Sequence, residues 1–267
     1  MSQYETMILE KKEGVAILTF NRPEKLNAIN PQWAADFFEA MKEISNDDSV
    51  RAIIFTGAGR AFCAGLDLDY AQELAEAQKR GEDAYKGLSG SSAAMIKIVR
   101  ELPKATIGAI NGPASGGGIT IALGCDIRIA AKDALIIFPF VPFVGLTPEV
   151  GSTYTLPRLI GSGRAFEILC TGKPISGKEA AEIGLVNYAV PNDKLMEKAM
   201  NLAQSFAKAA PIALQLAKQL IYEGLDADFY HHIAREDRAL ISTFRTEDHA
   251  EGVRAFLEKR KPVFKGK

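Results

Sequence analysis

The stretch Asn111-Gly112-Pro113-Ala114-Ser115-Gly116-Gly117-Gly118 is the most informative part of this 267-residue sequence. It follows an apolar run at 106–110 that predicts a buried strand, and it precedes an apolar run at 119–123 that can open a helix. Consecutive glycines are costly in backbone entropy, so they indicate a close backbone approach or N–H groups that must stay open. The stretch therefore predicts either a site at a helix start for an anion or a developing oxyanion, or a tight turn with close helix packing.

Two known phosphate-binding motifs fit this stretch poorly. A Walker motif ends in Gly-Lys-Ser/Thr, whereas Gly118 is followed by Ile119 and Thr120. A dinucleotide fingerprint places its glycines at the first, third and sixth positions, whereas the last three glycines here are consecutive. Neither motif accounts for the stretch.

The composition argues against several classes of protein. With 47 % hydrophobic residues, the chain can bury a sizeable core in one large domain, or in a domain with an appendage. Its formal net charge of −1 and the lack of a Lys/Arg run argue against nucleic acid as a partner. The three cysteines lack C-x-x-C spacing, which fits a reducing compartment and excludes a zinc ribbon. The histidines lack H-E-x-x-H spacing, and we expect no metal site.

No segment of the sequence predicts export or membrane insertion. The first residues do not combine a basic start with an apolar block, and the last residues are not a peroxisomal address. The longest apolar tract, at 134–146, is interrupted by Pro139 and Pro142 and is too short to span a bilayer. We therefore expect a soluble, cytoplasmic protein that has no membrane partner.

Strand and helix patterns alternate along the first half of the chain. Apolar runs predict strands at 7–10, 15–20, 52–56 and 106–110. The run at 52–56 is uninterrupted, which is typical of a parallel strand covered on both faces. Asn30-Pro31 predicts a helix start, and further helices are expected at 68–80 and 84–102. This alternation predicts an α/β fold with a mainly parallel sheet.

The second half of the chain has a different character. The segment Ser176-Gly177-Lys178-Glu179 is a capping box that opens a short helix. From residue 192 nearly every pattern is helical. We predict a core at 1–191 and a helical region at 192–267, which commonly packs on another subunit when it exposes an apolar face.

Two loops should converge on one site. The loop at 60–68 follows the strand at 52–56, and the glycine stretch follows the next strand. Ligands of parallel sheets bind beyond the carboxyl ends of the strands, and each loop ends where a helix starts. Two backbone N–H groups that point at one oxygen form an oxyanion hole.

These loops resemble those of the crotonase (enoyl-CoA hydratase/isomerase) superfamily. The similarity is carried in order by the segments at 21–28, 64–68, 111–118, 125–130 and 256–260. It implies a spiral of ββα units with a C-terminal helical trimerisation region, in a homotrimer or a dimer of trimers. It also implies an acyl-CoA thioester as substrate, so that coenzyme A is part of the substrate and no separate cofactor is needed.

The resemblance also implies roles for particular residues. The thioester oxygen would accept hydrogen bonds from the N–H groups of Leu66 and Gly117, while Lys25 and the loop at 64–68 would lie near coenzyme A. The apolar residues Val141 and Phe143, together with Phe138 and Phe140, are expected either to line the pocket for the acyl chain or to pack in the core. The expected substrate-binding residues are Lys25, Ala64, Gly65, Leu66, Asp67, Leu68, Gly116, Gly117, Val141 and Phe143.

The acid/base groups distinguish the reactions of the superfamily. Hydratases similar to this chain use two glutamates, and the matching positions here hold Thr120 and Val141. The segment at 144–153 instead resembles peroxisomal-type Δ3,Δ2-enoyl-CoA isomerases, in which a lone glutamate matches Glu149; related dienoyl-CoA and phenylacetate-pathway isomerases carry an aspartate there. Without the resemblance, Pro148-Glu149 is an ordinary helix opening.

The resulting prediction is an isomerase of fatty-acid β-oxidation that moves a double bond from C3 to C2 of an enoyl-CoA, with Glu149 as the single acid/base. Alternatives are other reactions through the same enolate, namely ring isomerisation, thioester hydrolysis, decarboxylation or hydration. A CoA-binding relative without catalysis is a further alternative. Cys63 is expected to pack rather than react, and Tyr154 either to touch substrate or to pack. Asp67 is expected to support its loop or helix start, with direct catalysis as the less favoured alternative.

Overall fold

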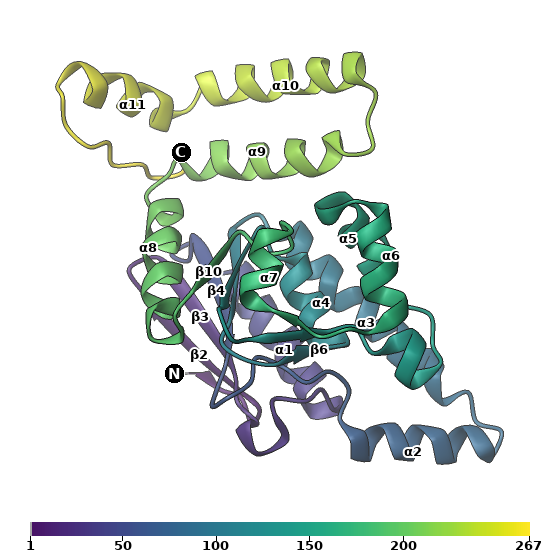
Figure 1. Cartoon of the computed structure of the whole chain (residues 1–267). Coiled ribbons are helices and arrows are strands. Elements are labelled where there is room, and N and C mark those ends of the chain that lie inside the picture. The colour runs from purple at the N-terminus through teal and green to yellow at the C-terminus, as the bar shows by residue number, and fades with distance from the viewer. Residues whose placement is uncertain (1) are drawn as a thin grey trace.

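Apolar strands alternate with helices along the core of the chain, as the sequence predicts (Figure 1). The computed structural model describes the backbone of residues 2–267 and the side chains of 4–84 and 92–267. The strands are β1 (Ser2–Gln3), β2 (Met7–Lys12), β3 (Val15–Phe20), β4 (Ala52–Gly57), β5 (Ala105–Ile110), β6 (Ala114–Ser115), β7 (Ile127–Ala131), β8 (Leu135–Ile137), β9 (Ile175–Ser176) and β10 (Tyr188–Val190). The helices are α1 (Pro31–Ser45), α2 (Leu68–Lys79), α3 (Ala84–Glu101), α4 (Gly117–Gly124), α5 (Ser152–Ile160), α6 (Ser162–Thr171), α7 (Gly177–Glu182), α8 (Leu195–Ala207), α9 (Pro211–Gly224), α10 (Phe229–Phe244) and α11 (Glu247–Leu257). Short helical turns are η1 (Pro23–Lys25), η2 (Phe140–Val144, of π type) and η3 (Asn192–Lys194).

The strands form two sheets within residues 2–267. The main sheet has seven strands in the order β1-β2-β3-β4-β5-β7-β10, in which the pairs from β3 to β10 are parallel and the two pairs at the β1 edge are antiparallel. The smaller sheet has the order β6-β8-β9. The mixed α/β class and the mainly parallel sheet predicted from the sequence are confirmed.

Alternate side chains of the central strands enter two separate hydrophobic cores. Ile53 and Phe55 of β4 lie in the same buried cluster as Trp33 of α1. Ile54, between them in the sequence, lies in a second buried cluster with Leu195 of α8. Both faces of β4 are therefore covered, as its uninterrupted apolar run predicts.

Two predicted helix starts are confirmed by their capping contacts. The Asn30 side chain accepts a hydrogen bond of 2.8 Å from the N–H of Trp33, which satisfies one of the unpaired donors of α1. Ser176 and Glu179 form the reciprocal capping box at the start of α7.

The interpretation of Pro148-Glu149 as the start of a helix is wrong, because α5 begins at Ser152. Val150 has a φ of 53° and Gly151 a φ of 72°, so the backbone turns through left-handed conformations before the helix starts. A β-branched residue such as Val150 rarely adopts that conformation. Glu149 therefore lies on an irregular segment between η2 and α5.

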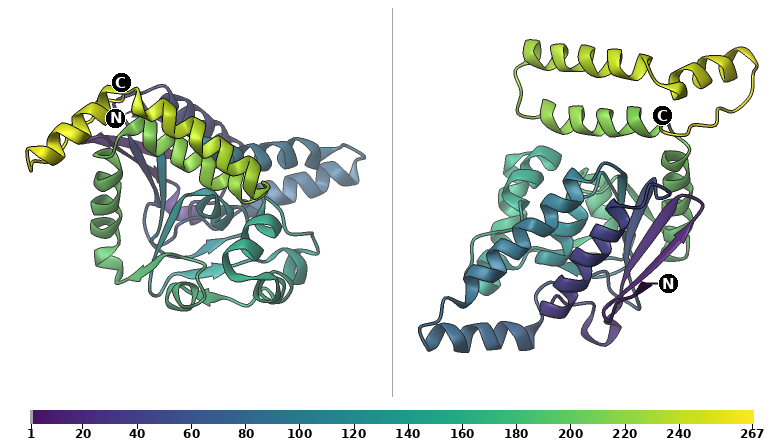
Figure 2. Two further views of the ribbon diagram at one scale, coloured as in Figure 1. Left: turned by 90° about the horizontal axis from the view of Figure 1, so that it is seen from above. Right: turned by 180° about the vertical axis from the view of Figure 1, so that it is seen from behind.

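The predicted helical region divides into two parts. Helix α8 packs against the main sheet, whereas α9, α10 and α11 lie together on one side of the core (Figures 1 and 2). The helical character of this region is confirmed, while the boundary at 191/192 and trimer formation stay predictions. Exposed apolar residues of these three helices are Ile221, Phe229, Tyr230, Ile233, Leu240, Ile241, Phe244, Val253, Phe256 and Leu257. Among the described residues, no helix has the length and apolar character needed to cross a membrane.

A buried asparagine ties together the loops that follow β3 and β4. Asn27 has a φ of 58°, a left-handed conformation that asparagine tolerates better than most residues. Its side-chain oxygen accepts from the N–H of Arg22 at 2.8 Å, and its side-chain nitrogen donates to the carbonyls of Ala58 and Ala61 at 2.9 and 2.8 Å. These bonds fix the start of the loop at 60–68 against the rest of the core.

Candidate active site

The two loops predicted to converge lie side by side in a parallel register. The N–H of Phe62 donates to the carbonyl of Pro113 at 3.0 Å, and the N–H of Ser115 donates to the carbonyl of Cys63 at 2.9 Å. Cys63 and Ala114 form a parallel bridge. Further along the two loops, a Cβ atom on Gly65 would lie 3.5 Å from the backbone nitrogen of Gly117, so the residue before Leu66 packs against the start of α4.

Glycine is required where the two backbones come closest. A Cβ atom on Gly118 would lie 2.3 Å from the carbonyl oxygen of Cys63, which is far inside contact distance. Gly65 has a φ of 90°, and a Cβ atom there would lie 2.8 Å from the carbonyl oxygen of Ser115. Close packing therefore explains part of the glycine stretch, and it brings Gly117 to the surface of a cavity.

Two backbone N–H groups at this junction lack an acceptor. Within the described chain, neither the N–H of Leu66 nor that of Gly117 donates a hydrogen bond to protein. Gly117 is the first residue of α4, whose opening N–H groups cannot pair inside the helix. Both residues line the same cavity. The pair can accept an oxygen that becomes negatively charged during a reaction.

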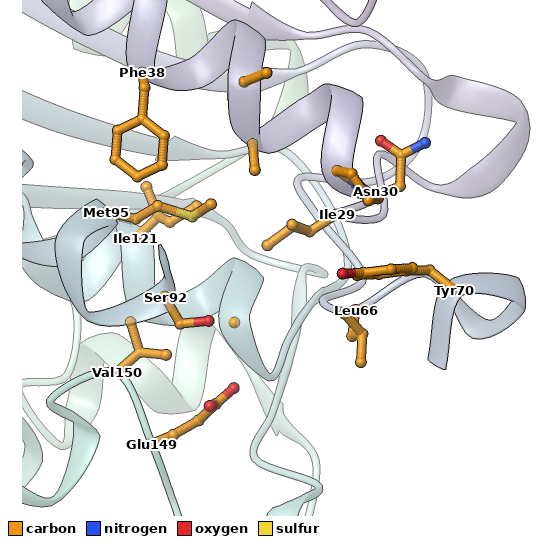
Figure 3. Close-up of a pocket in the computed structure, with 14 residues that line it drawn as sticks. Ile29, Asn30, Phe38, Leu66, Tyr70, Ser92, Met95, Ile121, Glu149 and Val150 are labelled. Atoms are coloured by element: carbon orange, nitrogen blue, oxygen red, sulfur yellow. The ribbon is translucent and has the colours of Figure 1, made fainter. Parts of the chain in front are cut away.

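The cavity has a volume of about 290 Å³ and is largely apolar (Figure 3). Helix α1 contributes Ala34 and Phe38, α3 contributes Met95, and α4 contributes Ile121. The polar side chains are few and come from separate elements. The complete lining consists of Ile29, Asn30, Pro31, Ala34, Ala35, Phe38, Leu66, Tyr70, Ser92, Met95, Gly117, Ile121, Glu149 and Val150.

Glu149 is the one carboxylate among the cavity residues whose side chains are described. In Figure 3 its carboxyl group points into the cavity, on the side where Ser92 and Leu66 also lie. The side chain reaches solvent at the mouth, and in the described chain it has no hydrogen-bond or ion-pair partner. Burial of the carboxyl group raises its pKa above the ordinary value for glutamate. An unpaired carboxylate with a raised pKa is suited to accept and return a proton.

The loop that carries Leu66 is held by an ion pair. Asp67 caps α2 by accepting from the N–H of Asp69 at 3.0 Å, and it pairs with Arg22 at 2.8 Å. Burial alone would raise the pKa of Asp67, but the bonds from Arg22 and Asp69 lower it below the ordinary value. This is the supporting position expected for Asp67.

Apart from Leu66, the residues expected near coenzyme A lie outside the cavity lining. Lys25 is half-exposed and pairs with Asp69 at 2.7 Å, and Leu68 is 83 % exposed. The N–H of Ala64 donates to the carbonyl of Leu26 at 3.0 Å, while Gly116, with a φ of 50°, precedes the first residue of α4. No described contact tests their binding of substrate, which stays a prediction.

Val141 and Phe143 do not line this cavity. They lie on η2 and are 40 % and 70 % exposed, while Phe140 is buried in the core and Phe138 is fully buried. The reason is local: the N–H of Phe143 bonds to the carbonyl of Pro139 at 3.1 Å, which winds the segment into a turn. That turn places the Phe143 ring against Gly172, at the end of α6, rather than in the cavity.

Three cavity residues with polar side chains were missed by sequence reasoning. Tyr70 comes from the first turn of α2, Ser92 from α3 and Asn30 from the residue before α1. Figure 3 shows the hydroxyl groups of Tyr70 and Ser92 directed toward the cavity. The position of Tyr70 four residues after Leu66 was a usable signal, whereas nothing local in the sequence marks Ser92.

Other candidates lie away from the reaction space. Cys63 is fully buried, and burial raises the pKa of its thiol to about 12, so it packs as expected. Thr120 donates its hydroxyl to the carbonyl of Gly117 at 2.7 Å and supplies no acid. Tyr154 bonds to Asp226 outside the cavity lining.

We predict that Gly118→Ala lowers the free energy of unfolding by about 2–4 kcal/mol, because the added methyl group would overlap backbone atoms that cannot rotate away. Urea denaturation measures the change. Gly163→Ala in α6 is the matched control, since a Cβ atom there meets nothing within 4 Å. Equal destabilisation of the two variants would contradict the close approach of the loops.

Comparison with known proteins supplies the family. The sequence profile described as Enoyl-CoA hydratase/isomerase matches residues 10–267. The chain is 39 % identical over 260 residues to a short-chain-enoyl-CoA hydratase of Clostridium acetobutylicum, covering 97 % of each protein. It is 36 % identical over 265 residues to a 1,2-epoxyphenylacetyl-CoA isomerase of Escherichia coli, covering 98 % of this chain and 99 % of that one.

A solved structure agrees with the sequence relatives. The crystal structure of an enoyl-CoA hydratase from Bacillus anthracis superposes with a TM-score of 0.92 at 36 % identity, covering 98 % of this chain and 100 % of that one. The profile match, the relatives and the shared fold together show that this chain is an enzyme of the enoyl-CoA hydratase/isomerase family, in the crotonase superfamily.

Proposed function

We propose that this enzyme is a Δ3,Δ2-enoyl-CoA isomerase in which Glu149 is the single acid/base. The observation that carries the proposal is the composition of the cavity. Among its described side chains it offers one free carboxylate, and it offers two unpaired N–H groups, from Leu66 and Gly117. Hydration requires an activated water and a proton donor, a task for which similar hydratases use two glutamates. Thr120 and Val141 stand at those positions.

The reaction needs no group beyond those in the cavity. Glu149 removes a proton from C2 of a 3-enoyl thioester, and the electrons of that C–H bond form a C2–C1 double bond as the thioester oxygen becomes anionic. The Leu66 and Gly117 N–H groups stabilise that oxygen. The electrons then return, the C3–C4 double bond shifts to C2–C3, and the same carboxyl group delivers its proton to C4. Proton number and charge balance without a cofactor.

Substrate binding follows from the same arrangement. The apolar walls from α1 and α3 suit the hydrocarbon part of an acyl chain, while the half-exposed Lys25 and the exposed Leu68 are accessible for contacts with coenzyme A. The exposed apolar residues of α9, α10 and α11 support assembly into a homotrimer or a dimer of trimers.

Ring isomerisation is the second candidate. The relative named 1,2-epoxyphenylacetyl-CoA isomerase is 36 % identical, and the hydroxyl groups of Tyr70 and Ser92 give the cavity hydrogen-bonding groups that a plain enoyl chain does not use. Product analysis with an oxygenated ring substrate beside trans-3-hexenoyl-CoA separates the two reactions.

Wild-type enzyme should convert trans-3-hexenoyl-CoA to the 2-enoyl isomer, and Glu149→Gln should lower kcat by at least about 10²-fold, because the amide cannot accept the C2 proton. Chromatography of the CoA esters follows both isomers and any 3-hydroxy product. Glu167→Gln, at an exposed position of α6, is the control and should be fully active. Full activity of Glu149→Gln would remove this residue from the mechanism.

The pH dependence of kcat/KM should report the carboxyl group directly. The base must be ionised in the free enzyme, so the rate should fall as pH decreases through the pKa of Glu149. Because burial raises that pKa, the fall should occur above the ordinary glutamate value of about 4.3. Initial rates measured between about pH 4 and 8 give this pH dependence. A rate that stays constant through this range would contradict a carboxylate base with a raised pKa.

A further inference from the structure

The turn after α9 contacts the helix that follows the proposed base. Asp226 lies in this turn, and one of its carboxylate oxygens accepts a hydrogen bond from the hydroxyl of Tyr154. Its other oxygen accepts from a guanidinium nitrogen of Arg158 at 2.9 Å. Tyr154 and Arg158 both belong to α5. One carboxylate from the C-terminal helices thus holds two consecutive turns of α5.

Cation–π contacts extend the cluster around Asp226 to a third element, helix α3. The Arg158 guanidinium lies 3.6 Å from the centre of the Tyr154 ring. Arg100, at the end of α3, lies 4.1 Å from the ring centre of Tyr222 in α9 and 5.5 Å from that of Tyr154. Such cation–π contacts stabilise the cluster in addition to the hydrogen bonds of Asp226. Helix α9 is therefore joined to α3 and α5, the two helices that flank the base.

The direction in which the Glu149 side chain points depends on α5. The carbonyl of Glu149 accepts from both the N–H and the hydroxyl of Ser152, at 3.1 and 2.7 Å. Between these residues, Val150 and Gly151 adopt left-handed backbone conformations. In the described chain no partner holds the Glu149 carboxylate itself. Its direction is therefore set by the backbone, and the strain at Val150 persists only while α5 stays in place.

We propose that Asp226 is a positioning residue for Glu149: by holding Tyr154 and Arg158 it fixes α5, and α5 fixes the strained segment that aims the carboxylate into the cavity. This inference rests on the proposed role of Glu149 as the base. Asp226 and Arg158 are partly solvent-exposed, so the pair itself contributes little to global stability. Its effect on rate is larger, because small displacements of a reacting group are costly.

The charge state of Asp226 suits a contact that persists at neutral pH. Hydrogen bonds from Tyr154 and Arg158 lower the pKa of Asp226 below its ordinary value, so the residue is ionised at neutral pH. Around Glu149, Tyr70 of α2 is the other titratable side chain described in the cavity lining, and among the described side chains of α1, α3 and α4 no charged group lines it. A change in the apparent pKa of the base therefore reports its exposure to water.

The test compares full-length Asp226→Asn with wild type on trans-3-hexenoyl-CoA. Loosening α5 should lower kcat about tenfold with KM nearly unchanged, since the substrate contacts of the two loops remain. It should also move the acid limb of the pH profile toward lower pH, because the partly desolvated Glu149 carboxylate becomes more exposed to water. Light scattering checks that the oligomeric state is the same.

Matched variants separate positioning from other effects. Asp237→Asn is the control, because Asp237 is an exposed acid of α10 whose side chain makes no interaction within the described part of the chain; it should behave as wild type.

Tyr154→Phe should reproduce the loss of kcat seen in Asp226→Asn. The double variant Tyr154→Phe/Asp226→Asn should lose less kcat than the product of the two single losses, because both substitutions remove the same Tyr154–Asp226 contact. Tyr154→Phe also serves as the test if Asp226→Asn does not fold.

The outcomes are distinct. Unchanged kcat and pH profile in Asp226→Asn would overturn the proposal, and so would a loss of kcat with an unmoved acid limb, which indicates a purely structural role. Glu149→Gln is measured in parallel. If it is inactive while Asp226→Asn resembles Asp237→Asn, the positioning role alone fails. If Glu149→Gln retains full activity, the base and its positioning residue both fail.

Discussion

The close approach of the loops that follow β4 and β5 is the contact on which the rest of the site depends. Gly118 admits the backbone of Cys63 where no larger residue fits, and this close approach brings Leu66 and Gly117 to the wall of one cavity. Two N–H groups then remain without acceptors at the wall of one cavity. Leu66 and Gly117 are both partly exposed at the cavity, so their N–H groups are accessible to a ligand. The arrangement makes physical sense if an oxygen atom of a ligand completes it.

The charges around the cavity are distributed unevenly. Asp67, which supports the loop, is neutralised by Arg22 and bonded to the N–H of Asp69. Glu149 has no such partner in the described chain, and its pKa is raised by burial. The pKa values of these two carboxylates are thus shifted in opposite directions, because Asp67 is paired with a cation whereas Glu149 is only partly removed from water. Such a separation is typical of a division between structural and catalytic roles.

Local sequence signals predicted the elements well. The cap at Asn30, the capping box at Ser176 and the fully apolar strand β4 depend on neighbouring residues, so the chain reveals them without tertiary information. The position of the two loops also followed from local reasoning, because loops after adjacent parallel strands emerge at the same edge of a sheet.

The cavity wall could not be predicted in the same way. Phe38 and Ser92 reach the cavity through the packing of α1 against α3, which no local pattern encodes. Val141 and Phe143, apolar residues that the sequence allowed at the acyl pocket, lie on the turn of η2, which exposes them and leaves them outside the cavity lining. The helix expected at Pro148 starts later, because Val150 adopts a left-handed conformation that sequence propensity disfavours. The irregular backbone at Val150 and Gly151 thus directly follows the proposed base.

The most direct test of the central claim is the infrared stretching frequency of the thioester carbonyl in bound hexanoyl-CoA, isotopically labelled at that carbon. The saturated ester cannot react, so it reports the hydrogen bonds to its oxygen alone. If the N–H groups of Leu66 and Gly117 both bind that oxygen in a cavity with few other polar groups, the frequency should lie below that of the ester in water. A frequency equal to or above the value in water would contradict the oxyanion hole on which the proposed mechanism depends.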